Sequence, residues 1–159
     1  MNLGHWAALM IAFLTMACLG GESVRGSVGG HTVGGDARAF LNMRSERMDL
    51  VLVHGGCREI PGTTKMLSFD PDDPWSILVK DLPPEAGPQQ FLPDGSPSLL
   101  FQRWEQSSGF ALTSSSTARG GSIDIVSLDL DAQTASGSFD VQMPDGSLMG
   151  TFEATPCSE

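Results

Sequence analysis

The sequence contains no tyrosine, only 3 cysteines, and 9 basic side chains against 19 acidic ones. The formal net charge of −10 repels phosphate backbones, so the composition excludes a nucleic-acid-binding protein and disfavours adsorption onto an anionic membrane surface. Charged residues make up only 18% of the chain and apolar residues 40%, which excludes a charged disordered chain and allows a hydrophobic core.

Common catalytic and zinc-binding motifs are also missing. There is no Cys-x-x-Cys or His-Glu-x-x-His spacing, and no Gly-x-Ser-x-Gly. His54-Gly-Gly is similar to the oxyanion loop of some esterases, but His54 is the last histidine, so a strand end turning on two glycines is the simpler interpretation. A thiol nucleophile formed by Cys57 with His54 or His31 is less favoured, because a disulfide accounts better for Cys57.

The sequence is long enough for one domain, and it contains many residues that form turns. The chain has 159 residues, of which 19 are glycine and 10 are proline, spread along its length. This composition favours short strands joined by tight turns over long helices.

The first 21 residues carry no acidic, lysine or arginine side chain. Within the stretch 6–19 only Thr15 and Cys18 are not apolar or glycine, and this length suits the hydrophobic region of a signal peptide better than a membrane span. The usual positively charged residues before the apolar stretch are absent.

The stretch LTMACLGG resembles the lipobox of bacterial lipoproteins. The resemblance implies a signal peptide over 1–17, lipidation of Cys18, and a short tether over 18–22 before a single β domain over 23–159. Thr15 departs from the pattern, because the family usually has leucine three residues before the cysteine. Ordinary signal cleavage with release of the protein, or an uncleaved anchor, are the alternatives.

The number of cysteines agrees with export. If Cys18 is lipidated or removed, Cys57 and Cys157 remain as an even pair, and exported compartments are oxidising, so we expect a disulfide between them. The bond would close a loop of about 100 residues, for which the chain-entropy model gives roughly 4–5 kcal/mol of stabilisation. The alternative is that Cys57 is a free thiol.

The C-terminal stretch GSFDVQMPDGSLMGTFEATPC, residues 137–157, predicts a hairpin. A two-residue Asp145-Gly146 turn would pair Met143 with Leu148, Val141 with Gly150, and Phe139 with Phe152, which puts all the apolar residues of the set on one face. Gly150 would leave room for a neighbouring side chain or mark a bulge.

Further strands are predicted upstream from alternating or continuous apolar residues. GSIDIVSLDLD changes phase, so we expect a bulge near Ile125-Val126 or a strand covered on both faces. The other predicted strands are 23–33, the central strand 48–55, 75–82, 98–104 and 109–115, with turns in CREIPGTT, FDPDDPW, LPPEAGP and LPDGSP. The stretch 36–48 fits either a helix capped by Asp36 or a strand, and its alternation of Ala37, Ala39, Leu41 and Met43 favours the strand.

About eight or nine short strands predict an all-β fold, either an antiparallel sandwich or a flattened barrel. The stretches GSIDIVSLDL and ASGSFDVQMPDGSLMGTFEATPC also resemble the C-terminal half of small bacterial envelope lipoproteins of uncharacterised function. The resemblance covers the signal and residues 120–157, and it implies a compact β domain without implying an activity.

Two stretches are candidates for calcium. FDPDDPW places Asp70, Asp72 and Asp73 in a short loop, and Asp129 and Asp131 share one face of a strand end. Calcium takes six to eight oxygen ligands, and neither stretch completes a calcium-loop pattern, so a solvated turn is the simpler interpretation.

Trp75 and Trp104 are candidates for a glycan-binding platform, although core positions suit one or both of them better. The leading hypothesis is an exported, lipid-anchored binding or assembly module of the bacterial envelope, without a cofactor. A small envelope hydrolase with an unrecognised site, and a calcium- or glycan-binding module, are the alternatives. We expect the protein to contact the membrane through its lipid anchor. The sequence does not identify an envelope protein or glycan partner.

Overall fold

The computed structural model describes residues 23–58, 66–106 and 109–157. The predicted signal peptide, Cys18 and the tether lie outside these residues, as does most of the turn CREIPGTT. The described part of the chain is all β, with thirteen strands, and it holds no helix of the length and apolar character that crossing a membrane requires.

The strands have the following bounds. They are β1 (Ser23–Val28), β2 (His31–Asp36), β3 (Arg38–Arg44), β4 (Arg47–Val53), β5 (Gly55–Arg58), β6 (Met66–Phe69), β7 (Trp75–Leu82), β8 (Gly87–Gln90), β9 (Ser98–Gln106), β10 (Phe110–Thr117), β11 (Gly120–Asp129), β12 (Thr134–Met143) and β13 (Gly146–Ala154).

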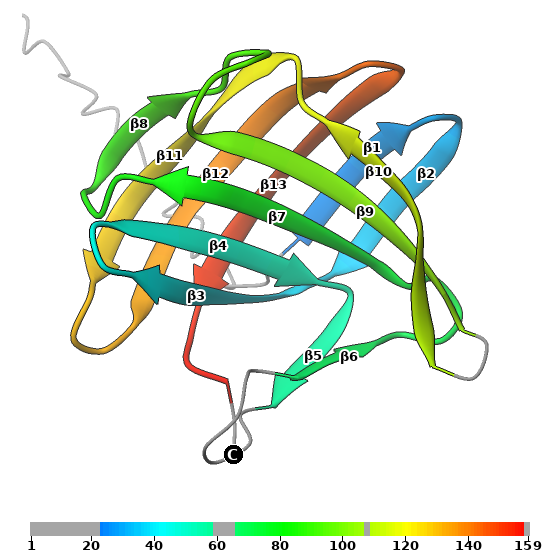
Figure 1. Ribbon diagram of the computed structural model, residues 1–159, viewed down its shortest axis with the longest axis horizontal. Coiled ribbons are helices and arrows are strands. Elements are labelled where there is room, and N and C mark those ends of the chain that lie inside the picture. The colour runs from blue at the N-terminus through cyan, green and yellow to red at the C-terminus, as the bar shows by residue number, and fades with distance from the viewer. Residues whose placement is uncertain (1–22, 59–65, 107–108, 158–159) are drawn as a thin grey trace, which may run out of the picture.

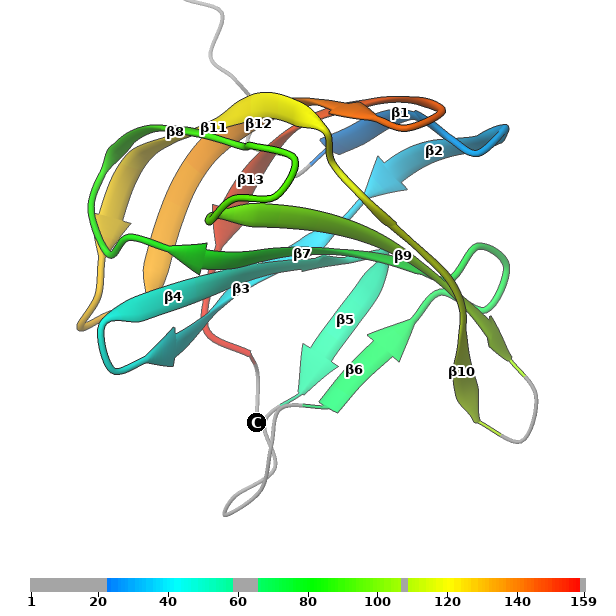
Figure 2. The ribbon, with the colours of Figure 1, turned by 45° about the horizontal axis from the view of Figure 1, so that its top comes forward.

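One curled sheet contains most of the strands. Its order is β10-β9-β7-β4-β3-β13-β12-β11-β8, and the β1–β2 hairpin joins it through pairing of β1 with β13. Figures 1 and 2 show β3, β4, β7 and β9 as one wall lying across β11, β12 and β13, while the separate β5–β6 pair hangs below. The all-β prediction is confirmed, and this half-barrel is compatible with the predicted sandwich or flattened barrel.

The described strands outnumber the eight or nine expected for two reasons. The short strands β5, β6 and β8 were not predicted as separate strands, and 23–33 is a hairpin of two strands. Gly29 and Gly30 adopt positive φ angles of 58° and 76°, a conformation that glycine reaches without steric cost. They reverse the chain between β1 and β2, which pair antiparallel.

The sheet changes direction at a row of three alanines. Ala135 pairs with Ala154, and Ala154 pairs with Ala39 in a parallel bridge of one residue pair, next to a hydrogen bond of 3.0 Å from Thr155 N to Ala39 O. All three alanines are buried. Since the contact ends after one pair, β3 diverges from β13 and the sheet folds over on itself.

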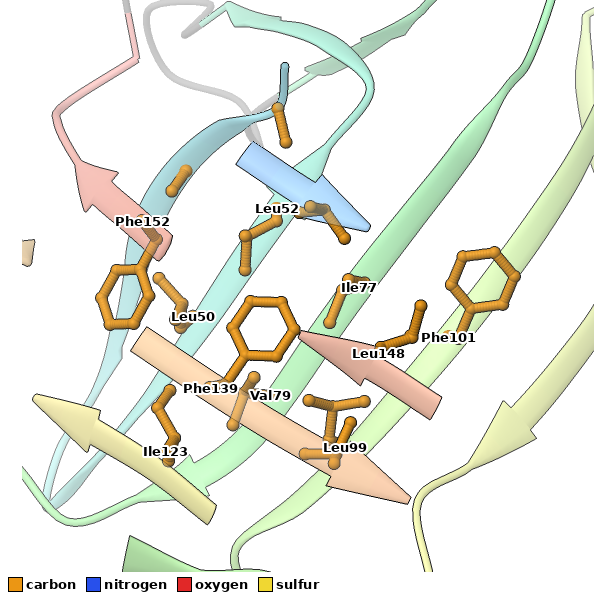
Figure 3. Packing of buried hydrophobic residues seen from close by; sticks show 14 of the residues in the cluster. Leu50, Leu52, Ile77, Val79, Leu99, Phe101, Ile123, Phe139, Leu148 and Phe152 are labelled. Carbon is orange, nitrogen blue, oxygen red and sulfur yellow. The ribbon is translucent and has the colours of Figure 1, made fainter. Parts of the chain in front are cut away.

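The two walls enclose the main hydrophobic core. Figure 3 shows Phe139 and Leu148 from one wall meeting Ile77, Val79 and Leu99 from the other. Side chains on opposite faces of a strand alternate, so each wall contributes every second residue to this core.

Strand β4 also has apolar residues on its outer face. Val53 and Val51 belong to a second cluster with Phe40, Phe69, Leu67, Trp104, Phe110 and both cysteines of the domain. The prediction that 48–55 is a central strand, apolar on both sides, is confirmed, because β4 lies between β3 and β7 and is covered on both faces.

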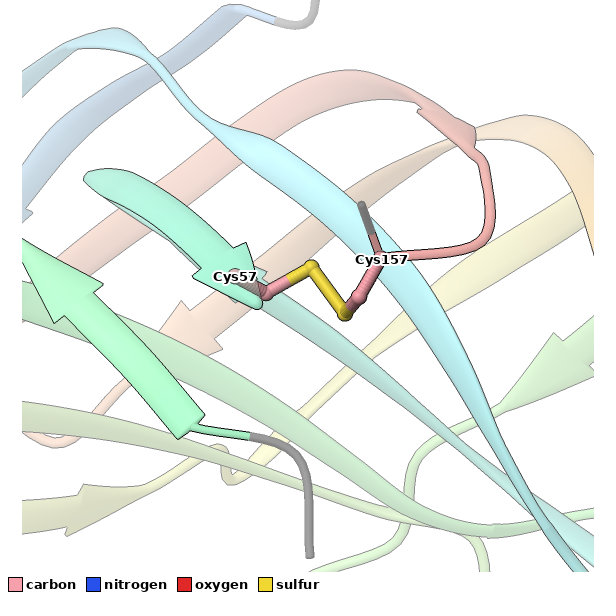
Figure 4. The surroundings of a disulfide bond; sticks show 2 residues. All are labelled: Cys57 and Cys157. Atoms are coloured by element: carbon pink, nitrogen blue, oxygen red, sulfur yellow. A yellow bond between two sulfur atoms is a disulfide. The ribbon is translucent and has the colours of Figure 1, made fainter. Parts of the chain in front are cut away.

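A disulfide joins Cys57 of β5 to Cys157, with a Cα–Cα distance of 5.3 Å (Figure 4). The predicted pairing is therefore present. It fixes the segment after β13 to the small β5–β6 pair, and so holds the second cluster against the outer face of β4.

The stretch 36–48 is a strand and a turn. Strand β3 turns back into β4 with Arg44 paired to Arg47. The buried carboxylate of Asp49 accepts hydrogen bonds from Arg44 Nη2 and, at 3.0 Å, from Asp81 N. The hydrogen bond and the charge of Asp49 raise the pKa of the Arg44 guanidinium above its usual value.

The predicted register of the C-terminal hairpin is wrong by two residues. Met143 pairs with Gly146 and Val141 with Leu148, so the turn residues are Pro144 and Asp145. A two-residue shift keeps every side chain on its predicted face, which is why the apolar pattern did not detect it. Gly146 is the first residue of β13 and not part of the turn. Its φ is 145°, and a Cβ there would collide with the carbonyl oxygen of Ser27 in β1, so this position requires glycine.

Two other details of this region are confirmed. The pairing of β11 with β12 shifts between Ile125 and Ser127, which is the predicted bulge, and it leaves Val126 exposed. Gly150 makes room for a side chain: a Cβ at this position would lie 2.9 Å from Cζ of Phe139.

Replacing Gly150 with alanine should therefore destabilise the protein. The added methyl group overpacks the Phe139 ring and the Ser23 carbonyl, and such changes cost about 1–3 kcal/mol in the free energy of unfolding, measurable by urea denaturation. Gly34→Ala is the matched control, since nothing lies within 4 Å of a Cβ at Gly34. Equal stability of the two variants would contradict the packing of Phe139 over Gly150.

Candidate functional site

A groove of about 270 Å³ lies between the edge strand β10 and the tip of the β1–β2 hairpin. Its lining comes from four parts of the chain: the β1–β2 tip, β9, β10 and the β12–β13 turn. The lining residues are Val28, Gly29, His31, Phe101, Arg103, Ser114, Ser115, Ser116 and Asp145. The groove therefore lies where the curled sheet fails to close.

Strands β9 and β10 form one wall of the groove. Ser114 pairs with Arg103 and Ser116 with Phe101, and residues directly opposite each other on neighbouring strands share a face. Leu99 and Phe101 fill the core, and Arg103 follows on the same face where the core ends. This alternation brings a guanidinium and two hydroxyl groups next to an aromatic ring.

The tips of two hairpins form the opposite wall. Gly29 N donates a hydrogen bond of 3.2 Å to Asp145 O, which joins the β1–β2 tip to the β12–β13 turn. The side chain of Asp145 is exposed. Within the described residues, neither the Arg103 guanidinium nor the Asp145 carboxylate has a hydrogen-bond or ion-pair partner.

Histidine 31 connects this wall to the loop before β7. His31 Nε2 lies 3.1 Å from Asp73 Oδ1, in a contact that is not aligned as a hydrogen bond. The backbone oxygen of Asp73 accepts a hydrogen bond of 2.8 Å from His54 Nδ1, and the His54 ring stacks on Trp75 at a centroid distance of 5.3 Å. Through Asp73, the loop before β7 thus contacts the side chains of both histidines in the described residues.

The predicted calcium residues do not converge. Asp70 Oδ1 accepts a hydrogen bond of 2.8 Å from Asp72 N, Asp73 faces His31, and Asp72 is exposed. Asp129 Oδ1 accepts a hydrogen bond of 2.9 Å from Ala132 N in the β11–β12 turn. Within 23–58, 66–106 and 109–157, no group of three or more His, Cys, Asp or Glu side chains is arranged to hold a metal ion.

The two tryptophans proposed as a glycan platform lie on different faces of their wall. Trp75 is fully buried between His54 and Phe101, and its indole N–H has no hydrogen-bond partner among the described residues. Trp104 packs on Phe69 in the second cluster and donates a hydrogen bond of 3.0 Å from Nε1 to Ser76. They do not form an exposed pair.

The region of Cys57 offers no thiol, because Cys57 is in the disulfide and His54 is bonded to Asp73. A smaller hollow of about 210 Å³ lies beside the disulfide, lined by Arg38, Ala39, Gly56, Cys57, Thr155 and Pro156. Among the described residues that line it, only Arg38 is charged, so it offers less chemistry than the groove.

None of the groove residues was predicted from the sequence to have a functional role except His31, and His31 was considered only as a base for Cys57. One signal was available: Arg103 follows the apolar residues Leu99 and Phe101 on the inward parity of its strand. The serines and Asp145 carry no local signal, because only the curling of the sheet brings them to Arg103.

Comparison with protein-family models, with curated proteins and with solved structures finds no match to this chain, so the geometry of the groove is the basis for any statement about its function.

Proposed function

We propose that this is an exported protein, anchored to a bacterial envelope membrane by lipid on Cys18, that acts as a binding module through the groove between β10 and the β1–β2 tip. The observation that carries the proposal is the groove itself. It gathers around Phe101 several hydroxyl groups together with a guanidinium and a carboxylate that have no partner among the described residues. Ligand sites of this kind combine an apolar floor with a few polar groups that fix orientation.

The position of the groove suits a protein tethered at its N-terminus. Residues 18–22 would span at most about 18 Å, at roughly 3.3–3.6 Å per residue, so the start of β1 would stay near the bilayer. Strand β1 runs from Ser23 to Val28, about 20 Å at its usual rise, and the groove lies at the Val28 end. The groove would then be accessible from the side away from the lipid.

The disulfide and the charge support the same location. A disulfide between Cys57 and Cys157 is maintained in oxidising compartments outside the cytoplasm. The net charge of −10 keeps the domain itself off an anionic bilayer, so the lipid alone would provide the attachment.

The intact mass of the protein isolated from its own membranes tests the anchor. We expect a species that begins at Cys18 with a diacylglycerol-sized addition, and that gains the mass of two hydrogens on reduction as the disulfide opens. A species that begins after Cys18 and carries no lipid would overturn the anchor. A mass unchanged by reduction would overturn the disulfide.

A hydrolase is the second candidate, and the contact of His31 with Asp73 favours it. Both His31 and the hydroxyls of Ser114 and Ser116 line the groove, and a serine nucleophile needs a histidine base oriented by a third group. The serine oxygen would attack the carbonyl carbon of an ester or amide while giving its proton to His31, and His31 would pass that proton to the departing alcohol or amine as the acyl-serine forms. Water, deprotonated by His31, would then hydrolyse the acyl-serine and release the acid. Within the described residues, no hydrogen bond joins His31 to either serine.

A fluorophosphonate probe separates the two candidates, because it reacts covalently with an activated serine hydroxyl. The binding module should remain unlabelled when its mass is measured after incubation with the probe. Labelling of Ser114 or Ser116 that disappears in His31→Gln would instead favour the hydrolase. Labelling that persists in His31→Gln would be nonspecific and would not support it.

A further inference from the structure

The groove has charges of opposite sign on its two walls. Arg103 belongs to β9 and Asp145 to the β12–β13 turn, and the two side chains do not pair with each other. Arg103 is half-buried, and its guanidinium has no ion-pair partner among the described residues. A ligand carboxylate would give it one through charge-assisted hydrogen bonds.

Neighbouring serine hydroxyl groups add hydrogen-bond donors to the Arg103 side of the groove. The hydroxyls of Ser114 and Ser116 lie on the same face as the Arg103 guanidinium. Guanidinium and hydroxyl groups are hydrogen-bond donors, and a carboxylate accepts from both with short, charge-assisted bonds. This side of the groove therefore suits an anionic group.

A ligand with only one sign of charge is disfavoured. A simple anion would meet repulsion from Asp145 and from the net charge of −10, while a simple cation would meet repulsion from Arg103. A ligand with both charges and no net charge satisfies the two walls together. The volume of about 270 Å³ lies just below the range of drug-sized pockets, so the ligand is small.

We propose that the groove binds a small zwitterion, such as a free amino acid or a short peptide with free ends. Its carboxylate binds Arg103 and the hydroxyls of Ser114 and Ser116, and its ammonium group binds Asp145. Phe101 and Val28 border the groove, and their few exposed atoms contact the apolar part of the ligand between its charged ends. This assignment rests on the proposed function of the groove as a binding site and names the chemistry of its ligand.

Isothermal titration of the full-length chain with alanine, dialanine and trialanine tests the proposal. The series varies the separation between ammonium and carboxylate while the side chains stay constant. One member should bind with a Kd of about 1 mM or lower, and its N-acetyl and C-terminal amide derivatives should each bind about tenfold or more weakly. Absence of binding by alanine, dialanine and trialanine would overturn the proposal that the groove binds a zwitterion.

Two variants assign the charged ends. Arg103→Gln should remove the discrimination against the amide but keep that against the N-acetyl form, and Asp145→Asn should do the reverse. Arg119→Gln and Asp124→Asn are the matched controls, because both residues are exposed and lie outside the groove, and both variants should bind as the unaltered protein does.

The outcomes separate this proposal from the proposed function. Equal affinity for the free and capped peptides, weakened by Arg103→Gln, would leave the groove as a binding site and overturn the zwitterion. Binding that neither groove variant affects would overturn both the zwitterion and the groove. The lipid anchor is tested independently by the intact mass.

Discussion

The row of buried alanines, Ala135, Ala154 and Ala39, is the constraint on which the rest of the structure depends. It is the bridge where the wall containing β12 and β13 continues into the wall containing β3 and β4. Methyl side chains let the two walls approach closely there, and the bridge of one residue pair lets them diverge beyond it. A larger side chain in this row would separate the walls and open the main core, because interiors are packed too densely to absorb extra atoms.

The same bend accounts for the groove. Because β1 occupies the edge of β13 before β3 reaches it, the β1–β2 hairpin continues past the bend and ends opposite β9 and β10. The core is filled up to Phe101, and the polar residues that follow it in β9 and β10 face the hairpin tip across open space. The disulfide acts at the other end of the molecule, where it holds the small β5–β6 pair over the outer face of β4. The molecule is thus cross-linked at the disulfide and left open at the groove, where a ligand has access.

Local patterns predicted the strands well and their assembly poorly. The bulge after Ile125, the doubly covered strand β4 and the disulfide were all predicted, because each depends on parity or on the number of cysteines. The hairpin register was missed because Gly146 was assigned to the turn, whereas its missing side chain accommodates β1, a strand more than 100 residues away in sequence. The groove was missed for the same reason. Arg103 was visible as a charge on an inward parity, but Asp145 and the serines reach it only through the bend at the alanine row, which no local pattern encodes.

The most direct test of this account is a set of methyl nuclear Overhauser effects among the three alanines. Side chains directly opposite each other on paired strands have Cβ atoms about 4.5–5.5 Å apart, well within the range of this measurement. The account predicts contacts from the Ala154 methyl group to both Ala135 and Ala39, joining β12, β13 and β3. Contacts of Ala154 with Ala135 but none with Ala39 would contradict it, since the two walls would then not be joined at this row and the groove between β10 and the β1–β2 tip would have no structural basis.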